Sequence, residues 1–274
     1  MQSSTVMKWV GGTTAILTLL FGLQRVVTSV ADARVKRNRT NELLRTAKLQ
    51  LADRRYDEAW ATLQQAETVN STSADVHSAQ EDVAMEWLDN IRVTPSEGTF
   101  TDVVRKVSPV LVRGTLSSAA TRRADLTAHL GWADFLLWRD GRVDLRPDDQ
   151  YRRAIALDST NAYAHAMWGH WILWQHGSID EAQSHFATAI RSGSHRQLVR
   201  GLQISALTGV RDSTADAALT AVANDIQKSG ESVSPDLRRR MAETICRTPP
   251  GRVGSDYAAR DRCIAAILNS TNPR

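Results

Sequence analysis

The sequence predicts an all-α chain in which stacked helical hairpins follow a single transmembrane helix. Apolar residues recur at helical spacing almost throughout from Thr40 onward, as in Leu43, Ala47 and Leu51. One pattern of acidic and small residues occurs twice, far apart in the chain, and an uncharged run lies near the N-terminus. We find no convincing run of alternating β-branched residues, so a sheet is not expected.

The uncharged run covers residues 9–24, between Lys8 and Arg25. A membrane helix needs roughly 20 apolar residues. This run is shorter, but Lys8 and Arg25 can extend their charged ends to the interface, and valines beyond Arg25 lengthen the apolar face. We therefore predict a transmembrane anchor over residues 1–30. The residues expected to lie in the bilayer are Trp9, Ile16, Leu19, Leu20, Phe21 and Leu23.

Two other interpretations of this segment stay open. A cleaved signal peptide has an apolar core of similar length, and Ala31-Asp32-Ala33 resembles a small-x-small cleavage site. Against cleavage, Arg25 intervenes, and the site lies well past the end of the apolar run. The third interpretation is a helix buried in a soluble core.

Basic residues concentrate directly after the apolar run. Residues 34–55 hold eight Lys and Arg against only Glu42 and Asp53, whereas the whole chain carries a net charge of +4. The remainder is slightly acidic, so no nucleic-acid partner is predicted. The basic excess favours a cytoplasmic position for the C-terminal side, and it predicts contact with anionic headgroups. The membrane-surface residues we expect are Arg34, Lys36, Arg37 and Arg39.

The duplicated pattern is a hydrophobic residue, D, E and A, then a large apolar residue four positions after the alanine and another alanine seven after. The copies are Tyr56-Asp57-Glu58-Ala59 with Leu63 and Ala66, and Ile179-Asp180-Glu181-Ala182 with Phe186 and Ala189. Tyr151 and Ala154 form a partial copy, and Ala154 precedes Ala189 by 35 residues. This pattern resembles the second helix of a tetratricopeptide repeat, which has a 34-residue period. The resemblance implies an α-solenoid that binds other proteins.

First helices also recur. The segments Trp138–Gly141 and Trp174–Gly177 both read W-x-x-G and lie 36 residues apart, and each glycine is placed to end a helix. Leu130-Gly131 and Trp168-Gly169 precede them at similar distances. Residues 142–149 form an inserted loop, in which Pro147 is expected to start the next helix.

These patterns predict four regions. Residues 1–30 are the anchor, and residues 31–93 hold a basic juxtamembrane helix and the first repeat. Prolines and glycines predict an irregular helical connection over residues 94–128, and the main array occupies residues 129–274. The breakers in the connection are Pro95, Gly98, Pro109 and Gly114. Within the array we expect helices over 196–208, 213–228, 234–246 and 255–268, the last of which cap the solenoid.

The sequence carries no motif of a reaction or of a cofactor. His165, His170 and His176 lack the i, i+4 spacing of a helical zinc site. Phosphate-loop, dinucleotide and nucleophile-elbow motifs are absent as well. Cys246 and Cys263 are interpreted as two buried thiols, with one disulfide across a hairpin as the alternative. We expect no cofactor and no enzyme activity.

Tryptophan is the residue type most expected to contact a partner. We predict partner binding by Trp171, Trp138 and Trp132, and core packing for Trp168 and Trp174. The predicted function is a non-catalytic, membrane-anchored scaffold or accessory subunit that binds other proteins of a larger membrane complex. The alternatives are a secreted or periplasmic repeat protein with a cleaved signal peptide and one disulfide, and an enzyme of unrecognised type.

Overall fold

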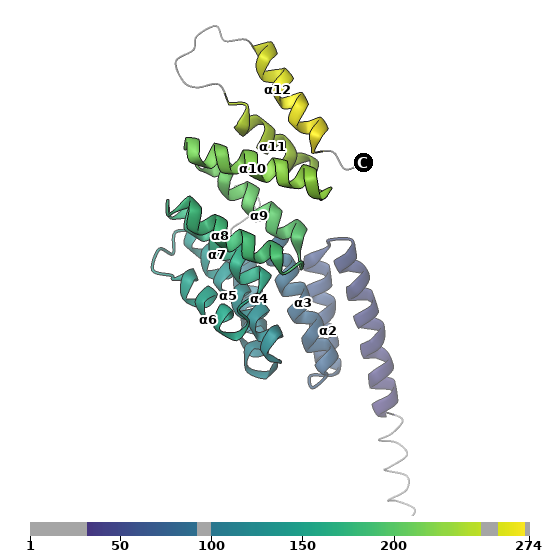
Figure 1. Cartoon of the computed structure of the whole chain (residues 1–274). Coiled ribbons are helices and arrows are strands. Elements are labelled where there is room, and N and C mark those ends of the chain that lie inside the picture. Colours follow the sequence, from purple (N-terminus) through teal and green to yellow (C-terminus); the bar gives the residue numbers. More distant parts are fainter. Residues whose placement is uncertain (1–31, 92–99, 248–256, 272–274) are drawn as a thin grey trace, which may run out of the picture. The chain divides into compact units, whose positions relative to one another are not determined.

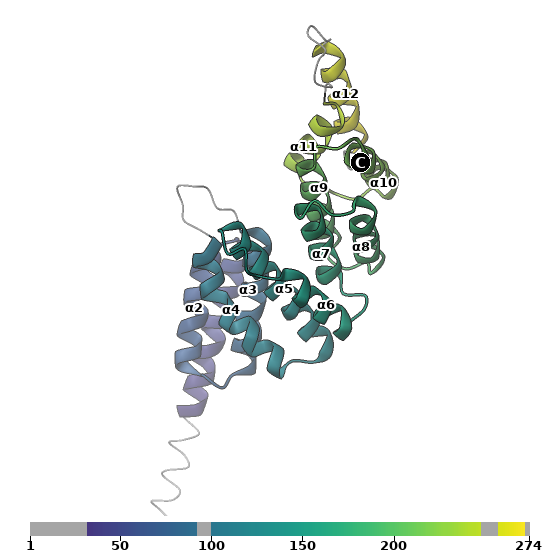
Figure 2. The ribbon, with the colours of Figure 1, turned by 90° about the vertical axis from the view of Figure 1, so that its left-hand side faces the viewer.

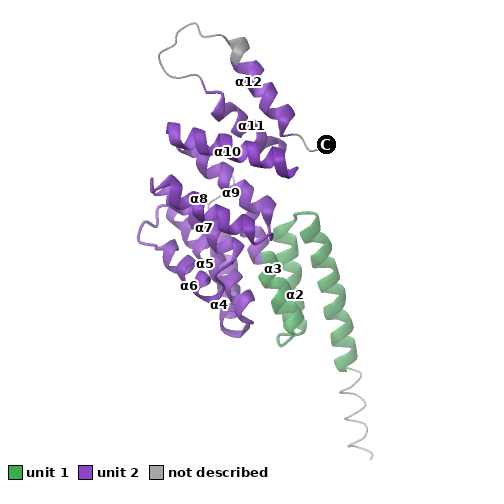
Figure 3. Ribbon diagram, viewed as in Figure 1, with its two compact units in different colours: residues 1–83 green, residues 84–274 purple. Residues whose placement is uncertain are grey.

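A computed structural model describes residues 32–91, 100–247 and 257–271, and within these ranges the chain is helical with no strand (Figure 1). None of the described helices has both the length and the apolar character to cross a membrane. The predicted anchor, residues 1–30, lies outside the described residues. The chain divides into two compact units, residues 1–83 and 84–274 (Figure 3).

Unit 1 contains a helix over residues 32–52, α2 (Tyr56–Val69) and the first part of α3 (Ala74–Asn90). The three apolar positions that follow the acidic pair in the first D-E-A copy, Ala59, Leu63 and Ala66, are fully buried. Ala66 packs in one cluster with Leu43 of the preceding helix and Val76 of α3. The small side chains at this spacing let the three helices approach closely, as the sequence pattern predicts.

Unit 2 is a series of helices in which neighbours along the chain pair (Figures 1 and 2). The helices are α4 (Phe100–Ser117), α5 (Ala120–Arg139), α6 (Pro147–Leu157), α7 (Ala162–Trp174), α8 (Ile179–Arg191), α9 (Arg196–Gly209), α10 (Ser213–Ser229), α11 (Pro235–Ile245) and α12 (Tyr257–Ser270). The paired helices are α5 with α6, α7 with α8, α9 with α10, and α11 with α12. The first helices of successive hairpins also pack together, α5 on α7, α7 on α9 and α9 on α11. This is the connectivity expected of a helical repeat, and the four helices predicted after Gly193 are confirmed.

Two glycines explain how the hairpins of unit 2 close. A methyl group at Gly131 of α5 would lie 2.6 Å from Cε1 of Tyr151 on α6. At Gly169 of α7 it would lie 3.1 Å from Cε2 of Phe186 on α8. Tyr151 and Phe186 are fully buried. In both hairpins, therefore, a glycine of the first helix receives the aromatic ring of the second.

Replacing Gly131 by alanine tests this packing. Overpacking of a filled core costs about 1–3 kcal/mol, and the better helix propensity of alanine returns up to about 1 kcal/mol. We expect Gly131→Ala to lower the free energy of unfolding, measured in urea, by on the order of 1 kcal/mol. The matched control is Gly201→Ala in α9, where the nearest atom, Cδ1 of Leu237, lies 3.6 Å away. Gly201→Ala should be more stable than wild type. A gain in stability for Gly131→Ala as well would show that Tyr151 does not pack tightly against Gly131.

In the region predicted as an irregular helical connection, residues 94–128, the described part from Phe100 onward is mostly regular helix. Helix α4 continues through Pro109, and α5 already begins at Ala120. Burial explains the continuity of α4, because its inner face holds Val104, Val107 and Leu111 while Pro109 itself is exposed. Because Pro109 has no N–H, the carbonyl of Arg105 four residues earlier loses its helical donor. Arg105 is exposed, so water can bind this carbonyl and the kink penalty is outweighed. The boundary between the two compact units falls inside α3, after Val83.

The two W-x-x-G segments end their helices in different ways. Gly141 adopts a left-handed conformation with φ of 98° and donates its N–H to the Trp138 carbonyl at 3.0 Å. In the second copy the left-handed residue is His176, with φ of 54°. Gly177 instead donates its N–H to the Ile172 carbonyl at 2.8 Å. The glycines therefore mark helix ends, as predicted, but only the first supplies the left-handed residue itself.

Cys246 and Cys263 are joined by a disulfide that links the end of α11 to α12, with 5.9 Å between their Cα atoms. The interpretation of these residues as two free buried thiols is therefore wrong. Both interpretations suit a helical hairpin, and the sequence favours free thiols because free cysteine is commonly a small core residue. Helix pairing decides the matter because it brings two residues 17 positions apart within bonding distance.

Candidate partner-binding surface

Two of the three tryptophans predicted to bind a partner lie in the core. Trp132 and Trp171 are each only 7% exposed. The indole N–H of Trp132 donates to the Leu88 carbonyl at 3.1 Å, and Trp171 packs edge-on against Trp138 and Phe135. Trp138 is half-buried. These contacts give Trp132 and Trp171 packing partners within the chain.

The position of α7 explains the burial of Trp171. This helix packs against α5, α6, α8 and α9, and it is apolar around its whole circumference, as a helix covered on all sides should be. Only its C-terminal end emerges from the array. Trp174, expected from the sequence to lie in the core, is 40% exposed at that end.

Trp174 forms an exposed aromatic and cationic surface together with Phe100 and Arg139, which we name the Trp174 patch. The Arg139 guanidinium carbon lies 4.8 Å from the ring centroid of Phe100 and 5.0 Å from that of Trp174. Stacking of this kind orders the arginine before any partner arrives. Helices α4, α5 and α7 each contribute one residue, so the patch exists only in the folded array.

A buried histidine, His170, holds the Trp174 ring in place through a hydrogen bond. The Trp174 indole N–H donates to Nε2 of His170 at 3.3 Å, and the His170 ring contacts Trp132 and Phe135. Burial, reinforced by the nearby Arg139 guanidinium, lowers the pKa of His170 to about 3. The imidazole is therefore neutral at physiological pH, which is the state that accepts the indole proton.

Asp140 fixes the other side of the patch. One carboxylate oxygen accepts hydrogen bonds from the backbone N–H and the hydroxyl of Thr101, at 2.7 and 2.8 Å. A carboxylate at the first turn of α4 satisfies a free N–H and suits the helix dipole. It also ties the start of α4, where Phe100 lies, to the end of α5, where Arg139 lies.

A second histidine cluster joins α7 and α8. The Nδ1 atoms of His165 and His185 lie 2.9 Å apart, and Nε2 of His165 lies 3.0 Å from the Ser159 carbonyl. A carbonyl only accepts, so Nε2 of His165 carries the proton and its Nδ1 accepts from His185. Burial lowers the pKa of both rings, and His165 lowers that of His185 further, to about 4. Within the described ranges no three residues of metal-binding type gather at one point.

The neutral histidines predict a loss of stability in acid. His185 titrates near 6.5 when unfolded and at about 4 when folded, so the unfolded chain takes up a proton more readily between these values. The free energy of unfolding should therefore fall as the pH drops from 6.5 toward 4. Asp134 acts in the opposite sense, because burial raises its pKa to about 6. Comparing wild type with His185→Gln isolates the histidine contribution.

The measurement is the urea midpoint of both proteins at pH 7.5 and pH 5. Wild type should lose more stability than His185→Gln over this interval. Equal losses in the two proteins would mean that His185 is not held neutral by the fold.

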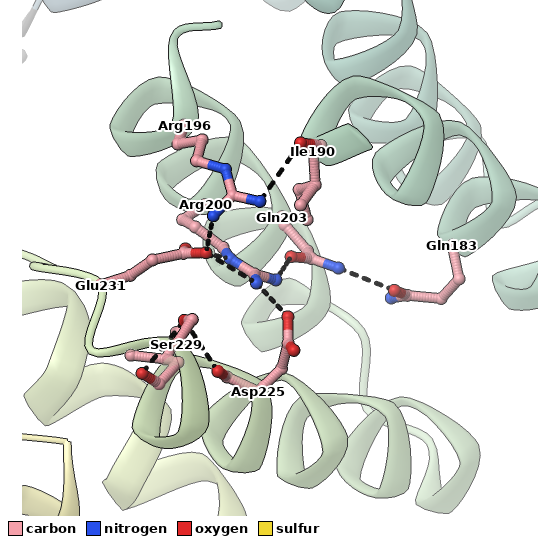
Figure 4. A network of polar contacts seen from close by, with 9 residues as sticks. Gln183, Ile190, Arg196, Arg200, Gln203, Asp225, Ser229 and Glu231 are labelled. Atoms are coloured by element: carbon pink, nitrogen blue, oxygen red, sulfur yellow. Dashed lines mark hydrogen bonds and ion pairs between the residues drawn. The ribbon is translucent and has the colours of Figure 1, made fainter. Parts of the chain in front are cut away.

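A buried polar network joins α8, α9 and α10 (Figure 4). Arg200, whose side chain is 3% exposed, donates from Nε to Glu231 at 2.7 Å and also contacts Asp225. Its Nη1 donates to Gln203, which in turn donates to Gln183 at 2.8 Å. Burial lowers the pKa of Arg200, but the bonds to Glu231 and Asp225 more than offset this and raise it overall. The buried Arg200 guanidinium thus ties three helices together, while the side chain of Asp225 is 58% exposed.

The predicted membrane-surface residues all lie on the helix over residues 32–52 of unit 1, where each is exposed. They are Arg34, Lys36, Arg37 and Arg39. The predicted bilayer residues, from Trp9 to Leu23, lie outside the described residues.

Three features of these sites escaped the sequence interpretation: the exposure of Trp174, the His165–His185 pair and the Arg200 network. Each feature depends on which helices pack against each other, and the spacing of residues along one helix does not reveal these neighbours. No protein-family model matches the chain, and neither curated proteins nor solved structures give a match.

Proposed function

We propose that this chain is a non-catalytic, membrane-anchored scaffold or accessory subunit that binds another protein through the Trp174 patch. The observation that carries the proposal is the pairing of a 40% exposed tryptophan with a stacked arginine at the open end of α7. Tryptophan and arginine dominate binding hot spots. A pre-ordered pair loses little side-chain entropy on binding.

The repeat architecture supports a binding role. Successive hairpins stack first helix on first helix, and an aromatic ring fills a glycine notch in two of them. This arrangement agrees with the proposed tetratricopeptide-like character. Solenoids of this kind more often present a binding surface than a reaction centre. Attachment to a membrane would raise the effective concentration of the patch near membrane proteins, so modest affinity suffices.

Co-purification tests the proposal. The full chain is extracted from its native membrane in mild detergent, as wild type, as Trp174→Ala and as Leu116→Ala. Leu116 is 83% exposed on α4 and serves as the matched control for loss of an exposed apolar side chain. A partner protein should accompany wild type and Leu116→Ala and be lost with Trp174→Ala. A chain that runs alone and monomeric in every preparation would rule the proposal out.

A second candidate keeps the binding role but changes the compartment. The Cys246–Cys263 disulfide favours an oxidising environment, whereas the basic residues after the apolar run favour the cytoplasmic side. A secreted or periplasmic protein with a cleaved signal peptide would satisfy the disulfide. N-terminal sequencing together with intact mass under non-reducing conditions decides between them. A retained N-terminus supports the membrane-anchored chain, and a cleaved N-terminus on the bonded chain supports the alternative.

A further inference from the structure

The helix over residues 32–52 presents a continuous basic stripe on the side away from its core. Four basic residues and one asparagine follow one another at intervals of three or four, which places them on a single face. The stripe consists of Arg34, Arg37, Asn41, Arg45 and Lys48. All five are exposed, and the four basic members make no ion pair with another described residue.

The opposite side of the same helix is the packed side. Thr40, Leu43 and Ala47 are buried there, again at helical spacing. Lys36 lies four residues before Thr40 and therefore falls on this side by spacing, and its carbonyl accepts the Thr40 hydroxyl. Arg39 is engaged with Glu42 at 3.5 Å. Of the residues predicted from the sequence, only Arg34 and Arg37 therefore belong to the stripe.

We infer that this stripe binds an anionic lipid surface with the helix lying along it. At 1.5 Å per residue the stripe is about 21 Å long, so it contacts headgroups over its whole length rather than only near its N-terminal end. The inference deepens the membrane attachment in the proposed function and rests on it. It does not depend on the Trp174 patch, which belongs to the other unit.

Two observations favour lipid over another polyanion. Leu49, four residues after Arg45 and so on the same face, is 59% exposed. An apolar side chain beside basic residues can insert at the boundary between headgroups and acyl chains. The phosphate backbone of a nucleic acid has no apolar region to receive it. In addition, the uncharged run of residues 9–24 ends ten residues before Arg34, which would place a bilayer-seeking segment next to the stripe.

The test uses the full chain with Asn41→Cys carrying an environment-sensitive dye in the middle of the stripe. The protein is reconstituted with vesicles of phosphatidylcholine alone or mixed equally with phosphatidylglycerol. We expect blue-shifted emission, shielded from an aqueous quencher, only with phosphatidylglycerol. Adding Arg45→Glu and Lys48→Glu should lower the ratio of shielded to unshielded protein by at least about 25-fold, since each basic residue contributes about fivefold to the binding equilibrium. Arg239→Glu with Arg240→Glu, exposed on α11, is the matched control and should change nothing.

Equal emission with both vesicle types, or full shielding in the charge-reversed variant, would overturn the inference. Shielding by a short DNA duplex but not by phosphatidylglycerol would assign the stripe to nucleic acid and overturn it as well. The charge-reversed variant should still co-purify with the partner that depends on Trp174. Lipid binding by the stripe and protein binding by the Trp174 patch are therefore tested independently of each other.

Discussion

Replacing Arg200 by methionine should destabilise the chain by about 3–5 kcal/mol, the range measured when one member of a buried ion pair is removed. The side chain is almost completely buried, and its removal leaves Glu231 paired with Arg196, whose side chain is 45% exposed. Gln203 loses the donor to its side-chain oxygen at the same time. Urea unfolding followed by circular dichroism gives the change in free energy.

The matched control is Arg142→Met. Arg142 pairs with Asp144 at 3.3 Å, but both side chains are exposed, and such pairs contribute little. Its urea midpoint should equal that of wild type. If Arg200→Met and Arg142→Met unfold at the same urea concentration, the network of Figure 4 does not lock α8, α9 and α10 together.

Phe186→Ala is the second change with a large expected effect, a loss of about 3–5 kcal/mol for a buried phenylalanine. Phe186 is fully buried against Gly169, so the truncation leaves a cavity between α7 and α8 that the helix backbones cannot collapse to fill. The free energy of unfolding in urea is again the measurement.

Two further variants show whether the loss comes from this packing. Phe186→Leu keeps most of the volume and should cost less than about 1.5 kcal/mol. Leu116→Ala removes an 83% exposed side chain and should stay within about 0.5 kcal/mol of wild type. A Phe186→Ala variant as stable as Leu116→Ala would show that the D-E-A spacing does not mark the core of the hairpin.

The helices and their pairing could be predicted because they depend on local spacing. Ala182, Phe186 and Ala189 are fully buried, as are Ala59, Leu63 and Ala66 of the other copy. Alanines and a large apolar residue at these intervals lie on one face of the helix. The stable arrangement packs this apolar face against a neighbouring helix. Pro109 suggested an irregular segment because a helix breaker is a local feature of the sequence. The burial of Val107 and Leu111, which keeps α4 continuous, depends on tertiary packing instead.

The candidate surface could be predicted only in part. Three tryptophans on α7 are equivalent in composition, and their spacing does not reveal that four helices surround Trp171 while Trp174 emerges at the end. The His165–His185 contact spans a helical hairpin and needs the register between α7 and α8. Both features belong to tertiary packing, which composition and periodicity do not encode at the level of single side chains.

Photo-crosslinking from position 174 in the native membrane tests whether the Trp174 patch binds a protein. A photoreactive phenylalanine analogue replaces Trp174 in the full chain, and the same analogue at Leu116 serves as the comparison. We expect a defined adduct with another protein from position 174 and none from position 116. Adducts from position 174 that contain only lipid or the chain itself would contradict the claim that the Trp174 patch binds a protein.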